Sequence, residues 1–364
     1  MSEEFSAPDR VHMRRALELA ARGLNTTDPN PRVGCVVANA ERVLGEGWHQ
    51  RAGEPHAEIL ALRAAGPQAR GACVYVTLEP CSHVGRTPPC ADALIAAAVA
   101  RVVCCSRDPN PKVAGSGIER LKSAGIAVAV GVLADEARSL NVGFFSRFER
   151  GRPFVRLKLA MSLDGRTAPA SGAQLWISGE ASRADVQNWR ARSSAVLTGS
   201  GTVRADDPLL NVRLTYGPWV RQPLRVVLDS MLRCAPSAKI FSGGGALVFA
   251  AADAPPQPRA DLRVERVPRG PGGLDLHAIM QRLAALEVNE LLLECGATLA
   301  GAFIAAQLVD ELVLYVAPKL LGEDAAPLLH LSGAGLPASL LAWELRAQQR
   351  FGDDVRLILG IKAS

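Results

Sequence analysis

The sequence has few aromatic residues and no long apolar run. Aromatic residues make up 5% of the chain, and no apolar stretch reaches the roughly 20 residues that a membrane-spanning helix needs. The first 15 residues are polar and charged, unlike a secretory signal peptide. No cluster of Lys and Arg alternates with aromatic residues, as a nucleic-acid groove would require. We therefore expect a cytoplasmic protein without a membrane or nucleic-acid partner.

The remaining composition is that of a globular protein with two domains. The chain has 364 residues, of which 48% are hydrophobic and 21% charged, enough for two domains with sizeable cores. Such cores need no disulfides, so the eight cysteines indicate a reducing compartment, and we expect Cys104 and Cys105 to be buried strand residues. The net charge of +5 fits a phosphorylated small substrate, among many other ligands.

One short span combines an imidazole, two thiols and a carboxylate. His56 and Glu58 stand two residues apart, and Cys81 and Cys90 follow. A hydrolytic zinc site needs three protein ligands and one open position for water, and His56, Cys81 and Cys90 supply the three. Glu58 is then the proton carrier and not a ligand. The order matches the H-x-E…P-C signature of zinc nucleobase deaminases.

The loop between the two cysteines offers a competing ligand. Eight residues separate Cys81 from Cys90, whereas the simple signature has only two. His83 lies in this loop and competes with His56 for the ion. We favour His56, because Glu58 otherwise has no anchor near the ion. A free cysteine is more often a small buried hydrophobe, but the combined spacing favours the metal.

Helix starts are expected to position these residues. Pro55 suits the first turn of a helix, and a second helix is expected over 91–98. Residues two apart on a helix point to nearly opposite sides. His56 and Glu58 therefore reach one ion only if it lies over the helix N-terminus, where the partial positive charge of the helix favours anions.

Alternating strands and helices predict an α/β fold for the first half. Strands are expected over 33–38, 43–48, 73–78, 101–105 and 127–132. Helices are expected over 11–22, 91–98, 118–124 and 134–147, and after His56. This pattern is typical of a three-layer domain. Residues 146–153 are charged and interrupted by Gly and Pro, so we divide the chain into domains 1–150 and 151–364.

Strands and helices also alternate in the second half, and two of its turns are candidate phosphate sites. Strands are expected over 154–160, 195–198, 224–228, 246–250, 262–267, 291–293, 311–317 and 355–361. Helices are expected over 180–192, 274–286 and 298–307. Residues 199–204 begin like a dinucleotide fingerprint, but Arg204 replaces its third glycine. Residues 291–301 predict a strand that turns through Gly296 into a helix, which fits phosphate binding as well as a tight turn. We expect Arg190 and Arg213 to be solvated.

Both halves of the chain contain long sequence motifs. The first half contains Pro29-Asn30-Pro31-x-Val33-Gly34, His49-x-x-Ala52-Gly53-x-Pro55-His56-Ala57-Glu58, Glu79-Pro80-Cys81-Ser82-His83-x-Gly85-Arg86-Thr87-Pro88-Pro89-Cys90 and Asp108-Pro109-Asn110-Pro111. The second half contains Lys158-Leu159-Ala160-x-Ser162-Leu163-Asp164-Gly165-Arg166, Trp176-Ile177, Ala205-Asp206-Asp207-Pro208 and Glu294-x-Gly296-x-Thr298-Leu299-Ala300. These motifs are long and specific, and through them the chain resembles, over nearly its whole length, the bifunctional deaminase/reductase of riboflavin biosynthesis.

This resemblance implies two folds and two activities. The N-terminal domain would be cytidine-deaminase-like and would use zinc to remove the ring amine of 2,5-diamino-6-(ribosylamino)pyrimidinone 5′-phosphate. The C-terminal domain would be dihydrofolate-reductase-like and would use NADPH to reduce the ribosyl group to ribityl. The partner implied is thus a phosphorylated pyrimidine ribosylamine.

The resemblance also implies binding residues. The first substrate would contact Asn30, His49, Arg86 and Asn110, with Arg86 near the phosphate. The cofactor would contact Ala160, Trp176, Thr202, Asp206, Ser230, Gly296, Ala297, Thr298, Leu299 and Ala300. The second substrate would contact Gln174, Arg190, Leu210, Arg213 and Glu294.

Three points in the reductase half go beyond these assignments. Gln174 stands where the family often has Ser, so its contact is open. Ser230 and Arg233 follow a strand end where the 2′-phosphate of NADPH would lie. Because the cofactor carries the hydride, no catalytic base is assigned, and Lys158 and Asp206 are the nearest candidates.

Two rival functions stay open at this point. One is a zinc deaminase that acts on cytidine or tRNA adenosine. The other is a zinc-stabilised scaffold without turnover, although a structural site fills its fourth position with a ligand and needs no residue like Glu58. The oligomeric state is also open, with a homo-oligomer as one option.

Overall fold

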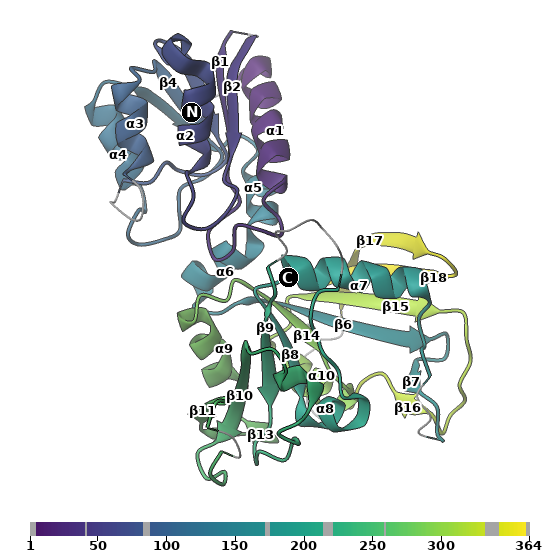
Figure 1. Ribbon diagram of the computed structural model, residues 1–364. Coiled ribbons are helices and arrows are strands. Elements are labelled where there is room, and N and C mark those ends of the chain that lie inside the picture. Colours follow the sequence, from purple (N-terminus) through teal and green to yellow (C-terminus); the bar gives the residue numbers. More distant parts are fainter. Residues whose placement is uncertain are drawn as a thin grey trace. The chain divides into compact units, whose positions relative to one another are not determined.

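The computed structural model divides the chain into two compact units, Met1–Gly151 and Arg152–Ser364 (Figure 1). It describes residues 5–40, 42–82, 88–171, 175–213, 221–257, 260–331 and 342–361. The division falls one residue after the boundary expected from the sequence. Among the described residues, no helix combines the length and the apolar character needed to cross a membrane.

The first unit is a three-layer α/β fold, as predicted. Its five-stranded sheet has the order β2-β1-β3-β4-β5, in which β3, β4 and β5 run parallel and β1 runs antiparallel to β2 and β3. The strands are β1 (Gly34–Asn39), β2 (Arg42–Trp48), β3 (Cys73–Val76), β4 (Arg101–Cys104) and β5 (Ala127–Val130). The helices are α1 (Ala7–Ala21), α2 (Ala57–Ala65), α3 (Cys90–Ala96), α4 (Ser116–Ser123), α5 (Ala134–Leu140) and α6 (Val142–Arg150).

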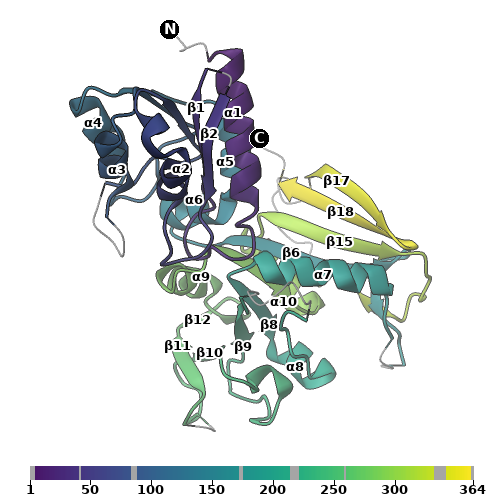
Figure 2. The ribbon, with the colours of Figure 1, turned by 45° about the horizontal axis from the view of Figure 1, so that its top comes forward.

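Alternate residues of the strands build a core on each face of this sheet. Cys35 and Val37 pack into one cluster with residues of α2, α3 and α4, whereas Val36 and Ala38 pack into another with residues of α1 and α5. Figure 2 shows these two helix layers on opposite sides of the sheet. A strand covered on both faces is apolar throughout, which explains the unbroken apolar run 34–38 of β1 before the exposed Asn39.

Two local predictions in this unit were wrong. The single helix expected over 134–147 is two helices, α5 and α6, separated at Asn141. The buried Asn141 side chain accepts a hydrogen bond from Arg32 N (2.8 Å) and donates one to Arg32 O (2.9 Å), and these contacts fix the break. Pro55 precedes α2 instead of lying in its first turn, because His56 is the N-cap, with extended backbone angles.

The second unit contains a nine-stranded sheet of order β11-β10-β9-β8-β14-β6-β15-β18-β17. The first seven strands in this order run parallel, and β18 and β17 are antiparallel additions at one edge (Figure 2). The sheet strands are β6 (Phe154–Ser162), β8 (Ala195–Gly199), β9 (Leu224–Leu228), β10 (Ala246–Ala251), β11 (Arg263–Val267), β14 (Glu290–Glu294), β15 (Glu311–Ala317), β17 (Trp343–Phe351) and β18 (Asp354–Ile361). Short strands form two further pairs, β7 (Arg166–Ala168) with β16 (Ala326–Pro327), and β12 (Arg269–Gly270) with β13 (Gly273–Leu274).

Helices cover both faces of this sheet. Buried residues of α9 (Leu276–Ala285) and α10 (Ala297–Ala305) join the core on one face. Those of α7 (Glu180–Arg192) and α8 (Ser200–Asp206) join the core on the other. The parallel strands end at one edge of the sheet, which is where ligands bind in open α/β folds.

The sequence did not predict β17, and the structure shows why. Its seven central residues are exposed and only its two end residues are partly buried. A strand without a buried face has no alternation of apolar and polar residues, and that alternation is the signal on which strand prediction depends.

Candidate functional site

His56, Cys81 and Cys90 converge in the first unit. Their ligand atoms all lie within 4.8 Å of one another. His56 Nδ1 is 3.6 Å from Cys81 Sγ and 3.3 Å from Cys90 Sγ. His56 is the N-cap of α2, Cys90 is the first residue of α3, and Cys81 lies in the loop after β3. Two helix starts and one strand end therefore meet at this cluster.

The spacing of these atoms fits a tetrahedral zinc ion. Zn–N and Zn–S bonds of normal length place a nitrogen and a sulfur ligand about 3.5 Å apart, close to the two distances observed here. The thiols also interact with each other: their hydrogen bond lowers the pKa of Cys81 and raises the pKa of Cys90. A hydrogen bond to Cys81 raises the pKa of His56. This set of one nitrogen and two sulfur atoms suits zinc, and it leaves a fourth position for water.

Glu58 lies directly beside the cluster. It is 3% exposed, and its carboxyl group interacts with the side chain of Cys90 and the charge of His56. Burial raises the pKa of Glu58. A buried carboxyl group beside this cluster, with a raised pKa, is suited to take up and release a proton.

Asn30 and His49 form a hydrogen-bonded chain next to His56 of the cluster. Asn30 Nδ2 is 3.0 Å from His49 Nε2, and His49 Nδ1 is 3.2 Å from the carbonyl oxygen of Pro55. The carbonyl only accepts, so Nδ1 carries the proton and Nε2 accepts from the Asn30 amide. Burial lowers the pKa of His49, which favours the neutral ring. The rings of His49 and His56 lie edge to face, with centroids 5.2 Å apart.

Asn110 and Arg86 are the other residues expected to bind the first substrate. Asn110 lies in the loop before α4, where its N–H donates to Asp108 Oδ1 (2.8 Å) and its Oδ1 accepts from Lys112 N (3.1 Å). Arg86 and the competing ligand His83 lie outside the described residues.

The second unit contains a buried cluster of charges at the carboxyl end of its sheet. Arg190 on α7 donates two hydrogen bonds to Glu294 at the end of β14, of 2.6 and 2.9 Å. Both side chains are about nine-tenths buried, with exposures of 9% and 11%. The expectation that Arg190 is solvated was therefore wrong, because the fold brings α7 against β14 and supplies a partner.

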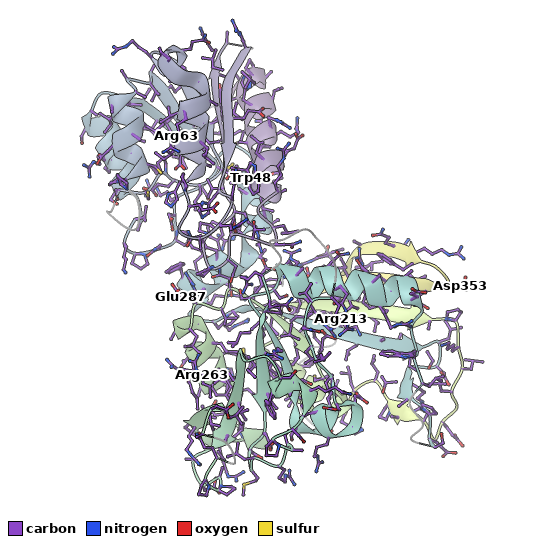
Figure 3. All side chains as sticks on the ribbon, viewed as in Figure 1. Trp48, Arg63, Arg213, Arg263, Glu287 and Asp353 are labelled. Atoms are coloured by element: carbon purple, nitrogen blue, oxygen red, sulfur yellow. The ribbon has the colours of Figure 1, made fainter. Side chains whose placement is uncertain are left out.

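Lys158 and Arg213 complete this cluster. Lys158 pairs in register with Glu294 across β6 and β14, and burial lowers the pKa of Lys158. Burial alone would raise the pKa of Glu294, but the combined effect of Arg190, Lys158 and Arg213 outweighs burial and lowers it. Arg213 (labelled in Figure 3) is an exposed residue beside α7, and its N–H donates to Gln187 Oε1 (3.0 Å). The solvation expected of Arg213 agrees with this exposure. Three cations and one carboxylate give the cluster a surplus of positive charge.

The predicted cofactor turn lies next to the start of α8. Gly296 is the N-cap of α10, and Gly199 is the N-cap of α8. A methyl group added to Gly296 would lie 3.9 Å from Thr202 Oγ1, and one added to Gly199 would lie 3.2 Å from Leu299 Cδ2. The adjacent strands β8 and β14 thus lead into two helix starts, and the N-cap glycine of each faces a side chain of the other helix. Thr202, Gly296, Ala297, Thr298, Leu299 and Ala300 belong to these starts.

The remaining predicted cofactor residues lie elsewhere on this edge. Ala160 pairs with Tyr315 in the sheet, and Asp206 ends α8, where burial raises its pKa. Trp176 is 71% exposed. Ser230 O accepts from Ala251 N (3.0 Å). Within the described part of the chain, no hydrogen bond or ion pair joins Trp176 or Ser230 to the Gly296 turn.

Leu210 and Gln174 are the remaining residues predicted to contact the second substrate. Leu210 is buried, and its φ of 49° lies in the left-handed region, which is uncommon for a residue with a side chain. Gln174 lies outside the described residues.

Sequence reasoning missed one polar residue of the first unit. Glu79 is 4% exposed, and its carboxylate accepts four backbone N–H groups from the segment that contains Asn110 and the start of α4. Glu79 begins the motif that continues with Pro80 and Cys81. No local signal in the sequence identifies its hydrogen-bond partners, because they lie 29 to 39 residues away.

Comparison with known proteins relates each unit to a family. Residues 6–106 match the cytidine and deoxycytidylate deaminase zinc-binding region. Residues 153–357 match the RibD C-terminal domain. The first match contains the His56–Cys81–Cys90 cluster, and the second contains the Arg190–Glu294 pair.

Whole-chain relatives show the same combination. The chain is 50% identical over 363 residues to the riboflavin biosynthesis protein RibD of Escherichia coli strain K12, an alignment that covers 96% of this chain and 99% of the relative. A solved structure of Acinetobacter baumannii RibD superposes with a TM-score of 0.90 at 44% identity, covering 98% of this chain and 99% of that one. A Thermotoga maritima structure, described as a diaminohydroxyphosphoribosylaminopyrimidine deaminase/5-amino-6-(5-phosphoribosylamino)uracil reductase, superposes at 0.86 with 32% identity over 98% of this chain and 99% of that one.

Proposed function

The chain belongs to the RibD family of riboflavin biosynthesis, whose members are bifunctional deaminases and reductases, and from this membership we propose how its residues divide the work. The first unit deaminates the diamino pyrimidine ribosylamine 5′-phosphate at a zinc site. The second unit reduces the ribosyl group of the product with NADPH. The activity by which the Thermotoga maritima structure is described supports this choice of substrate.

His56, Cys81 and Cys90 hold the zinc ion in this proposal. When bound, zinc lowers the pKa of its water ligand to about 7 and so supplies the nucleophile. The single observation that carries the deaminase function is the convergence of three ligand atoms within 4.8 Å of one another, beside a carboxyl group that interacts with Cys90. A scaffold site would have no use for that carboxyl group.

Glu58 moves the protons of the deamination. Its carboxylate oxygen takes the proton released by the attacking water and then delivers it to the departing amine, which leaves as ammonia. The raised pKa of Glu58, caused by burial, brings its proton affinity closer to the working pH. Positioned groups of this kind contribute about 10²–10⁴-fold in rate.

Asn30, His49 and Asn110 orient the first substrate, with Arg86 near its phosphate. The order of donors along the Asn30–His49–Pro55 chain leaves His49 neutral. A neutral, hydrogen-bonded ring beside His56 can hold a pyrimidine edge without adding positive charge near the metal. The asparagine side chains offer both a donor and an acceptor to the ring amide.

The reductase unit positions a substrate and a cofactor and leaves the chemistry to the cofactor. When bound, NADPH supplies the hydride. The Gly296 turn and Thr202 approach its phosphates, because the start of α10 presents backbone N–H groups that favour anions. Ala160, Trp176, Asp206 and Ser230 contact the rest of the cofactor, and Ser230 and Arg233 lie where its 2′-phosphate is expected.

The charge cluster receives the second substrate. Arg190, Arg213 and Lys158 outnumber Glu294, and the surplus positive charge complements a 5′-phosphate. Leu210 and Gln174 contribute further contacts to the same substrate. Lys158 has a pKa lowered by burial, which eases proton donation to the sugar oxygen as the ribosyl ring opens.

A reducing compartment is the setting that fits these residues. All eight cysteines are free thiols, and two of them belong to the metal cluster. Oxidation of Cys81 and Cys90 to a disulfide would remove the zinc ligands, so we infer that the protein works in the cytoplasm.

Mass spectrometry of the products tests the function directly. The enzyme is incubated with the diamino pyrimidine ribosylamine phosphate, with and without NADPH. Exchange of the amine for oxygen without NADPH, followed by gain of two hydrogens with NADPH, is expected. If the enzyme deaminates cytidine and leaves this substrate unchanged, the rival deaminase function replaces the proposal. No turnover of either compound by zinc-loaded protein would favour a scaffold.

A further inference from the structure

The buried carboxylate of Glu79 binds four backbone N–H groups from one distant segment. Its Oε2 accepts from Asp108 N (3.1 Å) and Gly115 N (3.0 Å). Its Oε1 accepts from Gly117 N (3.0 Å) and Ile118 N (3.2 Å). The first two donors close the loop that contains Asn110, and the last two lie in the first turn of α4.

This carboxylate therefore joins the loop of a metal ligand to the loop of a substrate contact. Glu79 stands two residues before Cys81. Gly117 approaches the same loop so closely that an added methyl group would lie 1.9 Å from Pro80 O. Ser82 Oγ and Ser116 Oγ are 2.6 Å apart, which adds another link between the two segments.

Helix α3, which begins at the metal ligand Cys90, is tied to the same segment. Arg120 on α4 pairs with Asp92 on α3 at 2.6 Å. Unlike the Glu79 contacts, this ion pair is exposed, with side-chain exposures of 48% and 40%. Exposed ion pairs contribute little to stability, so the buried carboxylate is the principal polar connection.

Only an ionised carboxylate satisfies this arrangement. It accepts through both oxygens, whereas an amide of the same size replaces one oxygen with an NH₂ group that only donates. Glutamine at this position would place that NH₂ group against two backbone N–H donors. The segment 108–118 would then have to move to find other acceptors.

We propose that Glu79 is a positioning residue for deamination: it holds the Asn110 loop in register with the metal cluster, so that substrate bound by Asn110 faces the Glu58 side of the metal. This inference rests on the proposed deaminase function and on the substrate role of Asn110. Glu79 is not among the three converging ligand atoms, and both of its carboxylate oxygens accept backbone N–H groups. Its loss should weaken substrate binding more than metal binding.

The test is Glu79→Gln in the full-length enzyme, with reductase activity as an internal standard for enzyme concentration and hydrogen exchange of the β4 amides as the control for folding of the first unit. We expect one zinc per chain to remain, reductase activity to be unchanged, and KM for deamination to rise by about tenfold, the size of one lost contact, with a smaller fall in kcat. Wild-type KM at full zinc occupancy would overturn the inference. Loss of zinc at unchanged protein fold would overturn it too, because Glu79 would then support the metal alone.

Matched variants separate this role from a general loss of charge. Glu119→Gln removes a carboxylate from the exposed side of α4 and should leave KM unchanged. Asn110→Ala should raise KM on its own, and the double variant with Glu79→Gln should be no worse than Asn110→Ala, because residues that act through one contact are not additive. Additive effects would contradict the link between Glu79 and Asn110.

A second substitution covers the case in which Glu79→Gln does not fold. Glu79→Asp keeps the charge but withdraws the carboxylate by one methylene group, so it should retain zinc and raise KM less than the glutamine variant. Wild-type KM for Glu79→Asp, in a chain whose Gln variant is unfolded, would show a purely structural role. An unchanged KM for Asn110→Ala would also overturn the inference, because Glu79 would then have no Asn110 contact with the substrate to position.

Discussion

The guanidinium of Arg190 and the carboxylate of Glu294 form a two-point ion pair, 2.6 and 2.9 Å long, between residues 104 positions apart. Both side chains are about nine-tenths buried, and Lys158 adds a second buried cation beside Glu294. Such a pair stabilises only when it is complete, because removal of one partner leaves an unpaired charge out of water. The pair therefore couples the charge cluster of the second unit to the stability of the sheet.

We predict that Glu294→Gln destabilises the second unit by about 3–5 kcal/mol, the usual cost of breaking a buried pair. Hydrogen exchange of the β14 amides in denaturant measures this unit separately from the first. Glu287→Gln, at an exposed site in the same unit (Figure 3), is the matched control and should change stability little. Equal protection of the β14 amides from hydrogen exchange in Glu294→Gln and Glu287→Gln would mean that Arg190 and Lys158 are hydrated well enough to need no counter-charge.

Glu58→Gln should separate deamination from metal binding. Glutamine has the same size but cannot carry the proton, so we expect deamination to fall by about 10²–10⁴-fold. Zinc content and reductase activity should match the wild type, since Glu58 is not among the three converging ligand atoms. Ammonia release, metal analysis and NADPH oxidation check the three expectations. A variant that deaminates at the normal rate would remove Glu58 from the mechanism.

The sequence was most informative where the chemistry is local. The convergence of His56, Cys81 and Cys90 could be predicted because few side chains bind zinc and their spacing follows a known signature. The apolar strands of both sheets could be predicted because burial on both faces leaves an uninterrupted apolar run, as in β1.

Features that depend on tertiary pairing could not be predicted. Nothing near Arg190 indicates that α7 packs against β14, so solvation was the reasonable default. Likewise, the four partners of Glu79 come from a segment at least 29 residues away. Asn141 breaks a helix only because Arg32, 109 residues away, is brought beside it. In each case a polar residue acquires its role from a contact that the local pattern does not encode.

Zinc should be required for deamination and not for reduction. Cys90→Ala removes a ligand from the cluster, so bound zinc and deamination should both fall to near background, while reductase activity persists because it resides in the other unit. Cys73→Ala changes a partly buried thiol of the same unit outside the cluster and should retain zinc. If Cys90→Ala keeps one zinc per chain, a residue outside the described part of the chain, such as His83, must complete the site.

The pH dependence of stability should report on Asp108. Burial raises the pKa of this carboxyl group from 3.8 to about 7. Between these values the folded state keeps a proton that the unfolded state releases, so the free energy of unfolding decreases as pH rises through this window and levels off above about pH 7. The shift corresponds to at most about 4 kcal/mol.

Asp108→Asn should remove this dependence. Asparagine still offers Oδ1 to the N–H of Asn110, now 2.8 Å from the carboxylate, but has no charge to bury. We therefore expect the variant to gain stability relative to the wild type on going from pH 4.5 to pH 8. Hydrogen exchange of the β4 amides at each pH measures the difference, and changes that the two proteins share, including loss of zinc in acid, cancel. Asp135→Asn, at an exposed site, should show no such trend; a constant difference for Asp108→Asn would mean that the carboxylate is ionised in the folded protein throughout this range.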